Sequence, residues 1–219
     1  MKLFLDTANI QEIRDAARLG VISGVTTNPS LAASEGIGDR ESYRAAVREI
    51  ANIIDGPISV EVVSQDSAGM IAEGREIAGW ISNPWIKIPS TVEGFEAISK
   101  LAQGGIKVNQ TLCFSLNQAL LGAQAGSTVI SPFVGRLDDI GHEGMDLVAE
   151  IVSVYRRYEI KTEVLAASIR HSLHCHLAAK AGAHIATVPF KVLMQMVQHP
   201  LTDAGLTRFL ADWKRAGSG

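Results

Sequence analysis

The sequence predicts an α/β fold, a (β/α)8 TIM barrel with an additional C-terminal helix. Eight short apolar or β-branched runs recur along the 219 residues, and each is followed by a segment with helical spacing. No glycine-rich phosphate loop follows the first run, which ends in Asp6-Thr7-Ala8-Asn9, whereas an open doubly wound sheet usually carries such a loop there. The chain is short for a barrel of this kind, so we expect its loops to be mostly brief.

Each predicted strand is a short run of apolar and β-branched residues of the length that buried strands have. In chain order the strands are expected at residues 2–6, 22–27, 58–63, 85–89, 106–112, 129–133, 164–168 and 184–189. Helices are expected between them, where apolar residues recur at helical spacing. They include residues 44–54, 68–77, 92–101, 116–125, 144–155 and 173–181, and two more helical segments follow the last strand.

The last helical segment, about residues 202–215, is the additional helix. It carries Leu206, Phe209, Leu210 and Trp213 at helical spacing. Such an apolar face can contact a neighbouring subunit or pack on the chain's own barrel, and the sequence leaves both open. No domain boundary interrupts the pattern, so we expect one domain, residues 1–219.

Composition excludes several classes of protein. Hydrophobic residues make up 47% of the chain and the net charge is −3, with Lys and Arg scattered, so we expect no nucleic-acid partner. No apolar stretch has the length of a membrane span, and Asp6 interrupts the apolar start, so we expect no membrane association and a cytoplasmic location. Cys113 and Cys175 are too few for a disulfide framework and are expected to be reduced thiols.

The most informative residue is Lys87, which lies inside the apolar run Trp85-Ile86-Lys87-Ile88-Pro89. Burying an ammonium is costly unless the group is paired or neutralised. Burial favours the uncharged amine, and an uncharged lysine amine is the nucleophile that condenses with a carbonyl to form a Schiff base. The alternative is a structural lysine whose head reaches solvent at the strand end.

Polar side chains gather at the ends of the predicted strands. In a barrel these ends form one mouth, and the active site lies there. The candidates in chain order are Asp6, Thr26, Asn28, Glu61, Lys87, Asn109, Thr111, Ser131, Ser168 and Arg170, with Phe133 sharing the parity of Ser131. Since the strand starts are mostly apolar, the pattern indicates one pocket.

Chemistry suggests a role for each group. Lys87 would attack a ketone, and Asp6 would act as the base that removes a hydroxyl proton when the neighbouring carbon–carbon bond breaks. Glu61 with Thr111, through a water, would relay protons for imine formation and hydrolysis. Arg136 and Arg170 follow the sixth and seventh strands and could bind a phosphate through paired hydrogen bonds. Barrel enzymes commonly bind phosphate near the ends of the seventh and eighth strands, so this location predicts a sugar-phosphate substrate.

Several of these residues also have ordinary structural interpretations. Asp6 could be a helix N-cap, and Asn28 before Pro29 could be only a turn and cap. Arg136 could pair with Asp138 or Asp139 in a loop.

A metal site is the alternative for a histidine cluster, His171, His174 and His176 with Cys175. Its spacing fits one helical face only partly, so we expect ordinary helix surface and no metal.

Five motifs, spread over nearly the whole chain, resemble the small single-barrel transaldolases and the related fructose-6-phosphate aldolases. They are Phe4-Leu5-Asp6-Thr7-Ala8-Asn9, Gly24-Val25-Thr26-Thr27-Asn28-Pro29-Ser30, Ile86-Lys87-Ile88-Pro89, Ser131-Pro132-Phe133-Val134-Gly135-Arg136-Leu137-Asp138-Asp139 and Ala167-Ser168-Ile169-Arg170. The resemblance implies a class I mechanism without metal or cofactor. It puts the Schiff base on Lys87, acid–base catalysis on Asp6, and the catalytic water on Glu61 and Thr111.

The resemblance also implies contacts to substrate hydroxyls from Asn28, Asn109 and Ser131, and a phosphate site at Arg136, Ser168 and Arg170. The aldolases carry glutamine at the position of Glu61 and tyrosine at that of Phe133, whereas the transaldolases match this chain at both. The implied reaction converts sedoheptulose 7-phosphate and glyceraldehyde 3-phosphate to erythrose 4-phosphate and fructose 6-phosphate, in pentose phosphate metabolism. Small members of the family are homo-oligomers, which implies a decamer or pentamer.

Three other functions remain as alternatives. The first is aldol cleavage of the fructose-6-phosphate aldolase type, which releases free dihydroxyacetone. The second is a non-catalytic barrel that only binds sugar phosphates. The third is a proton-transfer isomerase, which would need a neutral histidine or paired bases at the rim. No histidine falls at the end of a predicted strand, since His184 begins one.

Overall fold

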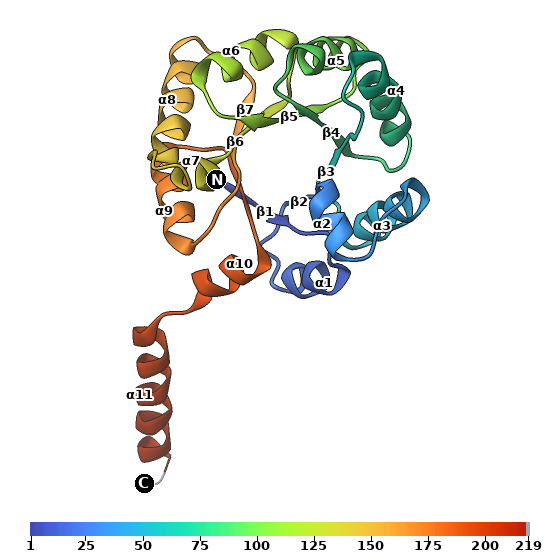
Figure 1. Ribbon diagram of the computed structural model, residues 1–219. Helices are drawn as coiled ribbons and strands as arrows, with labels where there is room; N and C mark the ends of the chain where they lie inside the picture. Colours follow the sequence, from blue (N-terminus) through green and yellow to red (C-terminus); the bar gives the residue numbers. More distant parts are fainter. Residues whose placement is uncertain (218–219) are drawn as a thin grey trace.

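The computed structural model describes residues 1–217 and has a closed barrel of parallel strands ringed by helices (Figure 1). The strands are β1 (Lys2–Asp6), β2 (Gly24–Thr26), β3 (Ile58–Glu61), β4 (Pro84–Pro89), β5 (Val108–Cys113), β6 (Val129–Pro132), β7 (Glu163–Ala166) and β8 (Ile185–Val188). They follow one another around the barrel in chain order, and β8 pairs with β1. The predicted (β/α)8 barrel is therefore confirmed.

Helices follow the strands, and most of them cover the outside of the barrel (Figure 1). They are α1 (Ile10–Arg18), α2 (Pro29–Ser34), α3 (Arg40–Ile53), α4 (Ser67–Ala78), α5 (Val92–Gln103), α6 (Leu116–Ala125), α7 (Val134–Asp138), α8 (Gly144–Arg157), α9 (Ser172–Ala181), α10 (Phe190–Val197) and α11 (Pro200–Ala216). The prediction for α3 started too late, because Asp39 and Ser42 form a capping box that begins the helix at Arg40.

The inward side chains form two layers along the barrel axis. Phe4, Trp85, Val129, Leu165 and Ile185 belong to one buried apolar cluster inside the barrel, and the Phe4 and Trp85 rings lie 5.6 Å apart. Because side chains alternate along a strand, the next inward residue lies two positions later, toward the mouth. For those five strands it is Asp6, Lys87, Ser131, Ala167 and Thr187. The apolar layer thus closes the bottom of the barrel, and the layer that faces its open end is polar except for Ala167.

The C-terminal helix α11 extends away from the barrel (Figure 1). None of its residues is buried, and Phe209 and Trp213 are 69% and 80% exposed. Packing of this apolar face on the chain's own barrel, one of the two alternatives, is therefore wrong. Separately, none of the helices among residues 1–217 is long and apolar enough to span a bilayer.

Candidate active site

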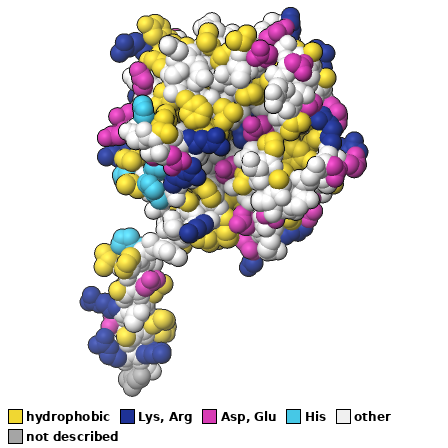
Figure 2. Space-filling model, in the orientation of Figure 1, with side chains coloured by type: hydrophobic (Ala, Val, Ile, Leu, Met, Phe, Trp, Pro, Cys, Tyr) yellow, Lys and Arg dark blue, Asp and Glu magenta, His cyan; other side chains and the backbone are white. Residues whose placement is uncertain are grey.

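A cavity of about 610 Å³ opens at the carboxyl ends of the strands. Figure 2 views the molecule from this side, and Lys or Arg side chains border the hollow. Of the predicted site residues, ten line it, namely Asp6, Thr26, Asn28, Glu61, Lys87, Ser131, Phe133, Arg136, Ser168 and Arg170. The other two, Asn109 and Thr111, are buried beside it.

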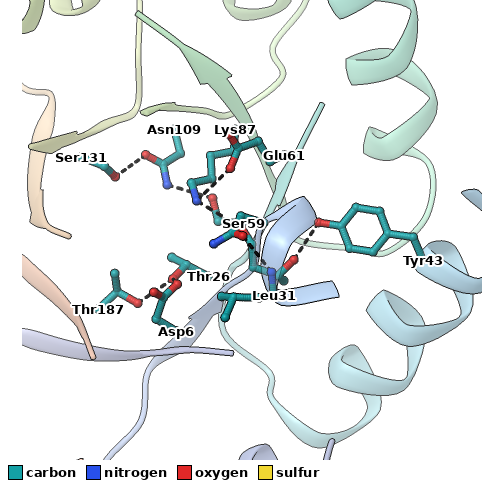
Figure 3. Close-up of polar contacts among 12 residues, drawn as sticks. Asp6, Thr26, Leu31, Tyr43, Ser59, Glu61, Lys87, Asn109, Ser131 and Thr187 are labelled. Atoms are coloured by element: carbon teal, nitrogen blue, oxygen red, sulfur yellow. Dashed lines mark hydrogen bonds and ion pairs between the residues drawn. The ribbon is translucent and has the colours of Figure 1, made fainter. Parts of the chain in front are cut away.

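Lys87 is buried, with 5% of its surface exposed, and lines the cavity. Its Nζ lies 3.1 Å from Oε2 of Glu61 and donates to the carbonyl oxygen of Thr27 at 3.2 Å (Figure 3). Strand register brings the two side chains together, since Glu61 of β3 is opposite Lys87 of β4. The alternative in which the lysine head reaches solvent is therefore wrong.

The Asp6 carboxylate belongs to a chain of hydrogen bonds at the opposite side of the cavity (Figure 3). Thr26 Oγ1 donates to Asp6 Oδ1 at 2.7 Å and lies 2.6 Å from Thr187 Oγ1. Because a threonine hydroxyl has one proton, Thr187 is the donor in the second bond. These hydrogen bonds hold the Asp6 carboxylate in place, and Asp6 still lines the cavity. Asp6 is not a helix cap, because Asn9 caps α1.

Thr187 was missed by the sequence interpretation, although it lines the cavity. It is the polar residue near the end of the eighth strand and shares the inward parity of Ile185. That position is the signal that could have found it.

Asn28 has both of the roles considered for it. Its Oδ1 accepts from the backbone N–H of Leu31 at 2.9 Å, so it is the N-cap of α2. It also lines the cavity beside Lys87. The cap fixes the side chain with its amide nitrogen left for other contacts.

Asn109 and Thr111 lie on β5, and both are fully buried. The Asn109 amide donates to Ser59 Oγ at 2.8 Å and accepts from Ser131 Oγ at 2.7 Å (Figure 3). It therefore orients Ser131, which lines the cavity. Thr111 Oγ1 has no hydrogen-bond partner within residues 1–217.

Arg136, Ser168 and Arg170 also line the cavity. The Arg136 guanidinium lies over the Phe133 ring, 5.5 Å from its centroid, while Arg170 Nη2 lies 2.8 Å from Asp139 Oδ2. The loop ion pair to Asp139 is thus made by Arg170, and Asp138 pairs with His174 instead. The proposed pairing of Arg136 with either aspartate is wrong.

Helix α7, which carries Arg136, touches the loop that carries Arg170 at Gly135. The Gly135 N–H donates to the Ser168 carbonyl at 3.0 Å, and a Cβ at this position would lie 2.3 Å from that oxygen. Glycine is therefore required for α7 to approach the loop after β7.

The expectation that the histidines lie on ordinary helix surface is wrong for His174. This side chain is buried; its Nδ1 accepts from the Arg170 N–H at 3.3 Å and its Nε2 lies 3.0 Å from Asp138 Oδ2. Burial, followed by repulsion from His171, lowers the pKa of His174, although Asp138 opposes the shift. A neutral imidazole that accepts at Nδ1 and donates at Nε2 fits this geometry. Within residues 1–217, no three His, Cys, Asp or Glu side chains are grouped so that they could hold a metal ion.

Comparison with known proteins gives full-length matches. Residues 3–218 match the family described as Transaldolase/Fructose-6-phosphate aldolase. A protein of Heliobacterium modesticaldum named "Probable transaldolase" is 61% identical over 214 residues, which cover 98% of each chain. Proteins with the same name from Dehalococcoides mccartyi and Thermoanaerobacter sp. are each 59% identical and cover 98% and 99% of both chains, respectively. The fold and these matches together identify the chain as a member of the transaldolase/fructose-6-phosphate aldolase family.

Proposed function

We propose that the protein transfers a dihydroxyacetone unit between ketose and aldose phosphates through a Schiff base on Lys87. The observation that carries the proposal is a buried amine, 3.1 Å from the Glu61 carboxylate, in a cavity also lined by Asp6. A lysine amine in such a site can condense with a ketone, and a separate carboxylate can work as the general base. Relatives named as probable transaldolases support the transferase over a binding protein.

In the first half-reaction the amine of Lys87 attacks the ketone carbon of the donor, and water leaves as the iminium forms. Asp6 removes the proton of the hydroxyl group two carbons away from that centre. The bond between this hydroxyl-bearing carbon and the carbon next to the iminium breaks. Its electron pair forms the enamine with the iminium, the hydroxyl oxygen becomes the aldehyde oxygen, and the aldose phosphate leaves. The acceptor aldose then reverses these steps, and water hydrolyses the final imine.

Imine formation and hydrolysis need a second acid–base group. Glu61 can take a proton from Lys87 directly, because their atoms are 3.1 Å apart. The Thr111 hydroxyl is buried on β5 and can hold a water for this step, with Glu61 as its base.

Substrate binding follows from the remaining cavity residues. Asn28 and Ser131 can contact the sugar hydroxyls, Asn109 supports Ser131, and Thr26 supports Asp6. Arg136, Arg170 and the Ser168 hydroxyl suit a phosphate, since guanidinium groups bind phosphate oxygens through paired hydrogen bonds. Arg170 would exchange its ion pair with Asp139 for the phosphate, at small cost because both side chains are more than half exposed.

Acceptor dependence separates the transferase from the aldolase. Fructose 6-phosphate alone should release a burst of at most one glyceraldehyde 3-phosphate per Lys87, because the enamine then waits for an acceptor. Adding erythrose 4-phosphate should give continuous turnover in a rapid-quench assay. Continuous release without any acceptor would instead support aldol cleavage, and no burst at all would support mere binding.

We also propose that α11 makes the protein a homo-oligomer. Its exposed apolar residues have no covering element among residues 1–217, and apolar patches of this kind mark protein contacts. The double substitution Phe209→Glu and Trp213→Glu should therefore produce monomers in analytical ultracentrifugation.

A charge on the other side of α11 provides the control for that experiment. Ala211 is exposed and lies away from the apolar face, so Ala211→Glu should keep the wild-type mass. The proposal that α11 forms the contact between subunits would be contradicted if the wild type were a monomer. It would also be contradicted if Ala211→Glu dissociated the oligomer as completely as the double substitution does.

A further inference from the structure

We propose that Tyr43 and Thr27 are positioning residues that hold the nucleophile from outside the barrel. The inference rests on the proposed function, since it takes Lys87 as the Schiff-base lysine. Neither residue was among the site residues expected from sequence. Tyr43 lies on α3, outside the ring of strands, and does not line the catalytic cavity.

Thr27 connects Tyr43 to the amine. This residue directly follows β2 and is fully buried. Its carbonyl oxygen accepts from Lys87 Nζ at 3.2 Å, and its Oγ1 lies 2.7 Å from the Tyr43 hydroxyl. Figure 3 shows Tyr43 pointing from its helix toward the barrel. One residue therefore carries two hydrogen bonds, one toward the nucleophile and one toward the outer layer of helices.

The backbone of Thr27 is fixed by a third hydrogen bond. Its N–H donates to the carbonyl of Ser59 on β3 at 2.9 Å. With both the amide and the side chain anchored, the peptide that carries the carbonyl oxygen has little freedom to turn away from Lys87. The distance between that oxygen and the amine is therefore set by Thr27, and not by Lys87 alone.

Tyr43 itself is held by the outer layer. Its ring lies edge-on to Trp80, with centroids 6.1 Å apart, and Arg40 lies over the Trp80 ring. Burial raises the pKa of Tyr43 to about 12 and outweighs the opposite effects of hydrogen bonds from Thr27 and the Glu61 backbone. The hydroxyl is therefore protonated at neutral pH, and its neighbours are the two residues that contact the amine of Lys87.

This arrangement gives the lysine a defined approach to the ketone. With the carbonyl of Thr27 on one side and the Glu61 carboxylate on the other, Nζ has two fixed partners. Loss of the Tyr43 hydroxyl would leave the buried Thr27 Oγ1 without its hydrogen-bond partner. The Thr27 carbonyl would then be held less firmly beside Nζ. Misplacement of a reacting group by about 1 Å can cost roughly 100-fold in rate, so a partial loosening should cost about tenfold.

The test compares imine formation in four variants, each measured as the single-turnover rate of borohydride-trapped adduct with fructose 6-phosphate. Tyr43→Phe and Thr27→Val each remove one hydroxyl and should slow trapping about tenfold, with the KM for erythrose 4-phosphate unchanged. Because both remove the same hydrogen bond, the double variant should be no slower than the slower single variant. Thr27→Ser keeps the hydroxyl and should restore most of the rate.

Tyr155→Phe is the matched control. It also removes a buried hydroxyl, one that donates to the Ala119 carbonyl, and neither residue lines the cavity. The variant should therefore lower the melting temperature and leave trapping unchanged. Wild-type trapping rates in Tyr43→Phe and Thr27→Val would overturn the inference, as would equal slowing in Tyr155→Phe or multiplicative effects in the double variant. Failure of the wild type to trap would instead refute the proposed function.

Discussion

Replacing Lys87 with methionine is expected to lower kcat/KM by about 10⁴-fold or more, because removal of a nucleophile leaves only binding and the other catalytic groups. The side chain keeps nearly the same length, so the cavity retains its shape. Steady-state assays with fructose 6-phosphate and erythrose 4-phosphate measure the loss. Lys107→Met is the control, since Lys107 is exposed before β5, and it should retain wild-type activity. An active Lys87→Met variant would contradict the Schiff-base mechanism.

The same substitution should also lower stability, which must be separated from the catalytic effect. It leaves the Glu61 carboxylate, whose side chain is 16% exposed, without its ammonium partner. Removing one partner of a buried ion pair lowers the free energy of unfolding by up to about 3–5 kcal/mol. Adding Glu61→Gln should recover much of that free energy of unfolding without recovering activity. If the double variant were no more stable than the single one, Lys87 and Glu61 would not be coupled as the geometry indicates.

The second large effect is expected for Asp6→Asn. The asparagine oxygen can still accept from Thr26 Oγ1, so the local hydrogen-bond chain survives, but the base is lost. General acid–base groups contribute about 10²- to 10⁴-fold, and the rate of carbon–carbon cleavage should fall by that factor. Rapid-quench measurement of glyceraldehyde 3-phosphate release gives this rate.

Imine formation does not need the same base, so Asp6→Asn should still give a borohydride-trapped adduct with fructose 6-phosphate. The combination of trapping with little cleavage would identify the step at which Asp6 acts. Cleavage at the wild-type rate would remove Asp6 from catalysis. Loss of trapping together with cleavage would assign it to imine chemistry instead.

Much of the fold could be predicted because local patterns and the tertiary structure agree. The strand around Lys87 alternates between the barrel interior and the helix layer, and the same alternation fixes the inward direction of Asp6 and Ser131. The short helices α2 and α7, of 6 and 5 residues, were missed because they are too brief to show helical periodicity.

Strand parity gave the direction of a side chain but not its depth. Asn109 and Thr111 were expected in the same pocket as Lys87, yet both are fully buried and neither lines the cavity, which Asn109 reaches through its hydrogen bond with Ser131. Depth depends on how neighbouring strands are shifted, here Lys87 opposite Asn109, and that register is a tertiary property.

Contacts between segments far apart in the sequence could not be predicted from it. The pairing of His174 with Asp138, and of Arg170 with Asp139, depends on α7 lying against the loop after β7. From the sequence, His174 was expected on a helix surface, and Arg136 was the arginine considered as a partner for the two aspartates. Tyr43 is a similar case, since an aromatic residue on a helix gave no signal that its hydroxyl reaches Thr27.

The claim on which the other proposals depend is that the amine of Lys87 bonds to the ketose. Reductive trapping of the wild-type protein with fructose 6-phosphate and borohydride, followed by peptide mass spectrometry, tests it most directly. One dihydroxyacetone-derived adduct per chain is expected, on the peptide that contains Lys87. A missing adduct, or an adduct on any other lysine, would contradict it.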